Sequence, residues 1–196
     1  MAGRSKAEIA RLVGLFLFLA GLLVLSKPTL VAVVVGAPIA LLGEAVRCWA
    51  AGHLHKTEKL ITSGPYRFTR NPLYLGRLLL LTGFGIAAWM PIRALGQDVP
   101  LNIMALFLGL LVFFGYYMPR KERIEPARLE ALHGEEYRKY NAAVPALFPT
   151  FRPYADNGER WRGERFARNR EGLTAVVIVL LVGFFLAKAL LFPAAR

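Results

Sequence analysis

Long apolar runs without a charged residue constrain this chain more than any other feature. The clearest run, 99–119, holds 21 residues and no Asp, Glu, Lys or Arg. A helix needs about 20 residues to cross the hydrocarbon core of a bilayer. Inside lipid the backbone must satisfy its own hydrogen bonds, so such a run is expected to be an α-helix. The sequence therefore predicts an all-α integral membrane protein.

Further apolar runs bring the expected number of transmembrane helices to about five, in a single membrane domain over 1–196. The first run is slightly short, and no small-residue cleavage pattern follows it, so we interpret it as a retained helix rather than a signal peptide. The predicted segments, in chain order, are the spans 12–26 and 28–50, a loop 52–71, the spans 72–92 and 99–119, a charged helix with an interfacial segment 120–154, a basic linker 155–171 and the span 172–192.

Lys and Arg gather on one side of these spans. Residues 1–11 hold three of them, the loop 52–71 holds four and the region 119–171 holds twelve, whereas the opposite connections hold only Lys27 and Arg93. Cytoplasmic loops are enriched in these cations. We therefore expect the three basic segments to face the cytoplasm from the inner membrane of a prokaryote. This placement explains the net charge of +12 without nucleic-acid binding, which is not expected.

The residues that often form metal sites or disulfides are few. Cys48 is the only cysteine and lies among apolar residues, so packing is its expected role. His53 and His55 have no third ligand at a useful spacing, and no metal is expected. Glu44 and Arg47 share one helical face near the end of a span, where they form either an interfacial ion pair or the wall of a polar pocket.

The segment 62–76 reads TSGPYRFTRNPLYLG and separates two apolar runs. Ser63-Gly64-Pro65 is typical of a turn. Asn71-Pro72 is typical of a helix start, with Asn as the N-cap and Pro in the first helical position. A helix N-terminus has unpaired N–H groups and the positive end of the helix dipole, which favour a carboxylate or phosphate. A capped membrane helix with a basic flank would read the same way.

The charged region after 119 should lie on the same side of the membrane as that segment. It is amphipathic and favours a helix, and the proline-rich stretch 144–154 that follows should lie along the membrane interface. A zwitterionic ligand would fit between the two regions, with its anion on the loop and its ammonium on the carboxylates of Glu122, Glu125, Glu135 and Glu136.

The first segment resembles the signature of the isoprenylcysteine carboxyl methyltransferase family and its bacterial relatives, GxYxxxRHPxYxG or GxYxxxRNPxYxG. A second block resembles their EExxLxxxFGxxYxxYxxxVP. The two blocks follow the family's order, and the resemblance covers about residues 40–150. Three positions depart from the family pattern: Asn71 replaces the usual histidine, Pro126 the second glutamate and His133 the phenylalanine. The second block runs from Glu125 through Leu129, His133-Gly134-Glu135-Glu136-Tyr137 and Tyr140 to Val144-Pro145.

The resemblance implies S-adenosylmethionine at the cytoplasmic membrane face and a lipid or prenylated acceptor that enters from the bilayer. The family's acceptor-facing arginine falls on Lys121, with Arg123 close by, and these two with Glu125 are the implied catalytic residues. The implied cofactor contacts are Glu58, Lys59, Leu60, Ile61, Tyr66, Asn71, Pro72, Leu73, Tyr74 and Glu125.

The expected function is therefore methyl transfer like that of the isoprenylcysteine carboxyl O-methyltransferases. A phospholipid N-methyltransferase that acts on an ethanolamine headgroup shares the cofactor architecture and stays an alternative. A non-catalytic protein that binds anionic lipid through its basic face is a second alternative. Lipid reductases with a similar C-terminal block have many more spans than this chain, which disfavours that class.

Overall fold

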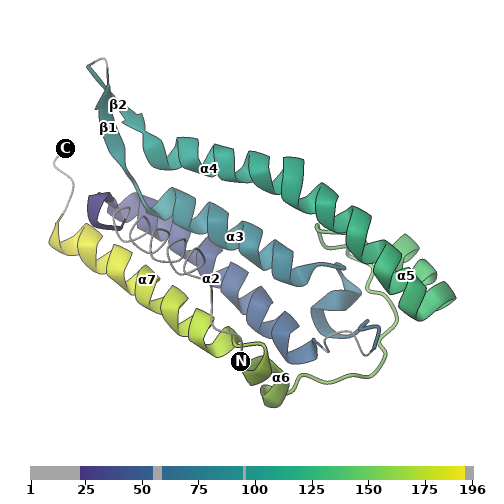
Figure 1. The fold of residues 1–196 in the computed structure, drawn as a ribbon. Coiled ribbons are helices and arrows are strands. Elements are labelled where there is room, and N and C mark those ends of the chain that lie inside the picture. The colour runs from purple at the N-terminus through teal and green to yellow at the C-terminus, as the bar shows by residue number, and fades with distance from the viewer. Residues whose placement is uncertain (1–22, 55–58, 95, 193–196) are drawn as a thin grey trace, which may run out of the picture.

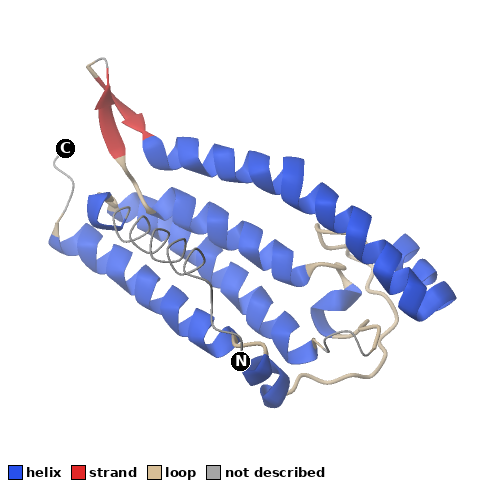
Figure 2. Cartoon of the chain, in the orientation of Figure 1, coloured by secondary structure: helices blue, strands red, loops and turns tan. Residues whose placement is uncertain are grey.

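The fold is a bundle of helices with one small hairpin, seen in a computed structural model that describes residues 23–54, 59–94 and 96–192 (Figures 1 and 2). The expected predominance of helices is confirmed, whereas the expected number of about five spans stays a prediction. The expected span 12–26 falls mostly outside the described residues. Within them, three helices are long and apolar enough to cross a membrane: Leu30–His53, Leu101–Ala143 and Glu171–Leu191.

The centre of the bundle is formed by α2 (Leu30–His53) and α3 (Pro72–Ala87), which pack along each other (Figure 1). Glycines let the two backbones approach closely. A Cβ built on Gly83 would lie 2.7 Å from the carbonyl oxygen of Gly36, and one built on Gly43 would lie 2.7 Å from that of Gly76. Such contacts between small residues are a common way of joining helices within a membrane.

The third helix is shorter than the expected span 72–92. It ends at Ala87, and the chain then forms β1 (Pro91–Ala94), which pairs antiparallel with β2 (Gln97–Pro100). Proline has no N–H to continue a helical ladder, which favours a break before Pro91. The connection between the third and fourth spans is therefore a β-hairpin, and it lies at the end of the bundle opposite α5 (Figure 2).

The expected fourth span and charged helix are one continuous element. Helix α4 (Leu101–Val112) runs through a π-helical turn η2 (Phe113–Tyr117) into α5 (Met118–Ala143). The rod bends at Gly134, whose φ of 52° lies in the left-handed region that glycine tolerates. The expected boundary at residue 120 marks a change from apolar to charged residues within a helix, not a break between two elements.

The last helices pack back onto the first described one. The short helix α6 (Gly163–Arg168) leads into α7 (Glu171–Leu191), which lies along α2. The ring of Phe185 joins Val33 in a buried apolar cluster between α7 and α2. The segment before α6 is also held, since the indole N–H of Trp161 donates to the Cys48 carbonyl oxygen at 3.1 Å.

An ionic cluster joins α2 to α7. The Arg47 guanidinium donates to both carboxylate oxygens of Glu171, at 2.8 and 2.6 Å, and its Nε lies 3.3 Å from a Glu44 oxygen. All three residues are buried. The pair Glu44–Arg47 therefore belongs to a contact between helices, and neither residue lines the main pocket of the described chain.

Candidate active site

A pocket of about 620 Å³ opens at the end of the bundle away from the hairpin. One wall comes from η1 (Gly64–Arg67) and the start of α3, and the other from η2 and α5. Its lining combines tyrosines, cations, apolar side chains and one carboxylate. The lining residues are Leu54, Tyr66, Arg70, Asn71, Pro72, Leu73, Tyr74, Tyr116, Tyr117, Arg120, Lys121, Ile124, Glu125 and Arg128.

The turn before α3 places Tyr66 in this wall. Gly64 has a φ of 56°, and a Cβ there would also meet the ring of His53 at 2.5 Å, so glycine is needed for both reasons. Tyr66 is buried, which raises the pKa of its phenol. The phenol of Tyr140 on α5 donates to the Tyr66 carbonyl oxygen at 2.8 Å. The turn expected at Ser63-Gly64-Pro65 is therefore present and is held from α5.

Asn71 occupies the N-cap position of α3, with Pro72 in the first turn as expected, but its side chain does not cap the helix. The amide instead donates to Glu122 Oε1 at 2.9 Å and to the Ala146 carbonyl oxygen at 2.8 Å. In place of a side-chain cap, the backbone carbonyl of Asn71 accepts the N–H groups of Tyr74 and Leu75. Asn71 is therefore the N-cap residue as expected, but its side chain is held by Glu122 and the Ala146 carbonyl oxygen and makes no capping hydrogen bond.

Arg70 ties three segments together at the base of the pocket. Its guanidinium donates to Glu122 Oε2 at 2.7 Å, to the Val144 carbonyl oxygen at 3.0 Å and to Asn141 Oδ1. Its backbone N–H donates to the Pro145 carbonyl oxygen at 2.9 Å. The geometry therefore gives Arg70 and Glu122 a positioning role, since they fix Asn71 and the start of α3 relative to α5.

The second wall is one face of a helix. Tyr117, Lys121, Ile124 and Arg128 are spaced by four, three and four residues, which puts them in one stripe that runs from η2 along α5. The rings of Tyr117 and Tyr74 lie 6.0 Å apart across the pocket. Tyr117, the first residue of this stripe, belongs to the π-helical turn η2, and such turns occur often at functional sites.

Lys121 and Glu125 form an ion pair on that wall, one helical turn apart. The Lys121 ammonium also lies 4.6 Å from the centre of the Tyr74 ring, within reach of a cation–π contact. Lys121 lies beyond the apolar part of its helix, and burial lowers the pKa of its amine to about 8. Both charges of the pair face the pocket, where they could bind opposite charges of a ligand.

Most of the residues that the sequence singled out meet in this pocket. Tyr66, Asn71, Pro72, Leu73 and Tyr74 line one wall, and Lys121 and Glu125 line the other.

The remaining candidates lie elsewhere. Arg123 is exposed on α5 outside the pocket lining. Leu60 packs in a buried cluster with Tyr137, and Ile61 packs against Tyr66 from behind. Lys59 pairs with Glu159 at 3.5 Å instead of lining the pocket. Glu58 lies outside the described residues.

Several lining residues were not among the sequence candidates: Leu54, Arg70, Tyr116, Tyr117, Arg120, Ile124 and Arg128. Helical periodicity, extended from Lys121 and Glu125 in both directions, would have found those on α5 and η2. Within the part of the chain that the structure describes, no three His, Cys, Asp or Glu side chains gather as a metal site would require.

The sequence is similar to one known protein family. A model of the phospholipid methyltransferase family matches residues 10–122, more than half of the chain. The chain belongs to the phospholipid methyltransferase family. This family lies in the same superfamily as the isoprenylcysteine carboxyl methyltransferases, as the two sequence blocks indicated. Neither the curated proteins nor the solved structures contain a match.

The matched region of this phospholipid methyltransferase family member ends at Glu122. It includes the whole first wall of the pocket but stops before Glu125 and Arg128 on the second. Helix α7 also lies outside it. The link between the two walls therefore rests on the contacts in the structure, above all those of Glu122 with Arg70 and Asn71.

Proposed function

We propose that this protein transfers a methyl group from S-adenosylmethionine to a lipophilic acceptor at the cytoplasmic face of the membrane. The observation that carries the proposal is the meeting of the two sequence blocks in one pocket. Asn71 and Tyr74 from the first block line the same pocket as Glu125 from the second, with Lys121 one helical turn before Glu125.

The pocket suits the cofactor in size and in chemistry. About 620 Å³ falls within the range of roughly 300–1,000 Å³ that is usual for small-molecule sites. Glu125 would hold the methionyl ammonium or the ribose hydroxyls. Arg128, one turn further along α5, would pair with the methionyl carboxylate. Leu73 and the buried ring of Tyr66 offer apolar surface for the adenine.

When bound, the cofactor would supply an activated methyl group on a sulfonium. The protein then has to align the acceptor with that methyl group and exclude water. Tyr74, Tyr117 and Ile124 would shield the reacting atoms, while Lys121 would hold an acceptor carboxylate or phosphate. Arg70 and Glu122 would keep the two walls in register.

A carboxylate acceptor needs no base, and the positive charge of the Lys121 ammonium favours the binding of such an anion. The family match favours an ethanolamine headgroup as a second candidate acceptor. An amine must lose a proton before it attacks, and Glu125 is the one carboxylate among the lining residues that could accept it.

Two measurements on the purified protein test the proposal. Calorimetry in detergent should show S-adenosylmethionine binding, and its absence would support a non-catalytic lipid-binding protein instead. Incorporation of labelled methyl groups should then be compared between a prenylcysteine analogue and phosphatidylethanolamine. Labelling of the first alone supports O-methylation, labelling of the second alone supports N-methylation, and labelling of neither would contradict both acceptors.

A further inference from the structure

The segment 144–154 carries two large aromatic side chains that are mostly exposed. Phe148 is 63% exposed and Phe151 is fully exposed. Single exposed apolar residues are normal on proteins. These two, however, lie on a short segment beside the pocket, and their surroundings indicate what covers them.

The segment is firmly seated, so the exposure of its aromatics does not come from a loose loop. The Thr150 N–H donates to the Phe68 carbonyl oxygen, and the Tyr154 N–H donates to that of Arg67, both at 2.9 Å. Leu147 is buried in a cluster with Met118. The backbone therefore turns Leu147 inward and holds Phe148 and Phe151 outward.

The outward side chains continue the exposed apolar surface of a helix that is long and apolar enough to cross a membrane. Phe107, Leu111 and Phe114 project from the outer face of the rod formed by α4 and η2. The ring of Phe114 stacks on that of Phe148, with centroids 6.4 Å apart and an interplanar angle of 18°. The exposed apolar surface of this candidate membrane helix thus continues through Phe114 onto the segment.

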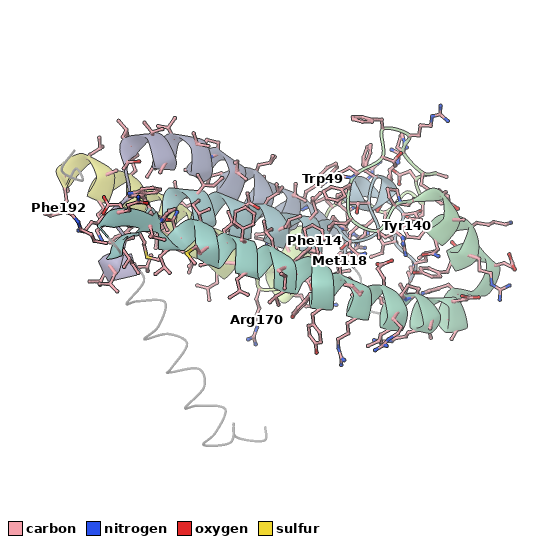
Figure 3. The ribbon with its side chains drawn as sticks, turned by 90° about the horizontal axis from the view of Figure 1, so that it is seen from above. Trp49, Phe114, Met118, Tyr140, Arg170 and Phe192 are labelled. Atoms are coloured by element: carbon pink, nitrogen blue, oxygen red, sulfur yellow. The ribbon has the colours of Figure 1, made fainter. Side chains whose placement is uncertain are left out.

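A second helix ends at the same level. Trp49 on α2 is partly exposed, and its ring lies 6.3 Å from that of Phe68, the residue that accepts the Thr150 N–H. Figure 3 shows Trp49 and Phe114 toward the same end of the bundle. Aromatic residues gather at the boundary between hydrocarbon and headgroups.

The charge of the segment fits the same position. Arg152 is exposed directly after Phe151, and residues 144–155 contain no Asp or Glu. An arginine beside inserted aromatics is suited to anionic headgroups. A face that joined two copies of the chain would not need to continue the lipid-facing surface of α4, and this continuity favours lipid.

We propose that residues 148–152 insert into the interface of the bilayer leaflet on the pocket side, with the rings of Phe148 and Phe151 among the upper acyl chains and Arg152 at anionic headgroups. This anchor does not depend on the reaction proposed above. It fixes the backbone of the segment that hydrogen-bonds to the Phe68 and Arg67 carbonyl oxygens, next to the pocket wall.

The test places a fluorescent label at Phe151→Cys in a Cys48→Ser background. The protein is reconstituted into vesicles that contain phosphatidylglycerol, a tenth of whose lipids carry a nitroxide on carbon 5 of the acyl chain. Two further sites calibrate the result: Leu111→Cys on the lipid-facing side of α4 and Glu136→Cys on the exposed side of α5. Because all three side chains are exposed, the substitutions should leave the fold intact, which size-exclusion chromatography checks.

We expect nitroxide lipid to quench the label at 151 about as strongly as the label at 111, and aqueous iodide to quench it far less than the label at 136. Strong iodide quenching with weak nitroxide quenching would overturn the proposal. Self-quenching at 151 that grows with the ratio of protein to lipid would overturn it in favour of a contact between copies. Replacement of phosphatidylglycerol by phosphatidylcholine should move the label toward water, and Arg152→Gln should abolish that difference.

Discussion

Glu125 stands among several cations on the pocket wall, and the cofactor proposal gives it a specific partner. Glu125→Gln should lower the affinity for S-adenosylmethionine about tenfold, since a charge-assisted hydrogen bond becomes a neutral one. The expected loss of affinity is no larger than this because the Glu125 carboxylate is nearly half exposed, and water weakens its contacts. Calorimetry measures it. Glu136→Gln removes the same charge from the exposed face of the helix and is the control. Equal affinities in the two variants would contradict the role of Glu125.

The lowered pKa of Lys121 predicts a pH dependence for acceptor binding. The amine is charged below its pKa of about 8 and neutral above it, so an anionic acceptor should bind more weakly as the pH rises through that value. The KM for the acceptor should therefore rise between about pH 7 and pH 9. In Lys121→Arg the side chain stays protonated over this range, and the rise should disappear. A rise of the same size in both proteins would exclude Lys121 as its source.

The residues in contact with the pocket were predictable from the sequence to the extent that they belong to a motif. Tyr66, Asn71 and Tyr74 were found in this way. The role of Arg70 was not, because its partners Glu122 and Val144 lie 52 and 74 residues further along the chain. The same distant glutamate accepts a hydrogen bond from the Asn71 amide, and this N-cap residue makes no side-chain cap. Local spacing cannot reveal a competitor that only the fold brings close.

The glycines between α2 and α3 set how closely the two central helices pack. In Gly83→Ala the new methyl group would overlap the α2 backbone, so the substitution should destabilise the protein by about 1–3 kcal/mol. Gly183→Ala on α7 places the same group in open space and should change stability little. Thermal unfolding of both variants in the same detergent makes the comparison. Similar melting temperatures would show that α2 and α3 can move apart to accommodate the methyl group at little cost in stability.

The ends of elements were harder to predict than their existence. Apolar runs located α2, α4 and α7 because hydropathy identifies what lipid can contact. The run after Pro72 continues to residue 92, yet α3 stops at Ala87 and the chain turns into the hairpin. Hydropathy does not distinguish a helical residue from an apolar strand residue. Hydropathy also does not show where a helix ends. The change to charged residues at 120 therefore suggested a boundary, although the helix continues through it.

The ion pair between Arg47 and Glu171 joins α2 to α7, which are far apart in the sequence. Glu171→Gln leaves a buried guanidinium with only Glu44 as a charged partner, and should cost about 3 kcal/mol of stability. Glu164→Gln on the exposed side of α6 is the matched control. Limited proteolysis between residues 155 and 170 should release α7 faster in the first variant than in the second. Equal rates would mean that the ion pair does not contribute to the docking of α7.

The docking of α7 could not be predicted from the sequence. Glu44 and Arg47 fitted either an interfacial pair or a pocket wall, because their third partner lies 124 residues beyond Arg47. A polar linker was expected before α7. In the structure this region contains the short helix α6, and Trp161, just before α6, donates a hydrogen bond to the Cys48 carbonyl oxygen on α2. What composition could predict was the class of protein and the position of several long apolar helices, not which of them touch.

The unbroken rod from α4 into α5 fixes the depth at which chemistry can take place. From Leu101 to Arg120 it rises about 29 Å at 1.5 Å per residue, close to the roughly 30 Å of hydrocarbon in a bilayer. The first cation of the pocket wall therefore stands one hydrocarbon thickness away from the hairpin. The number of helical residues between the hairpin and Arg120 therefore sets the distance between them. Under the proposed function, an acceptor would reach Glu125 only if its reactive group lies at that depth, and membrane thickness would then help to select the substrate.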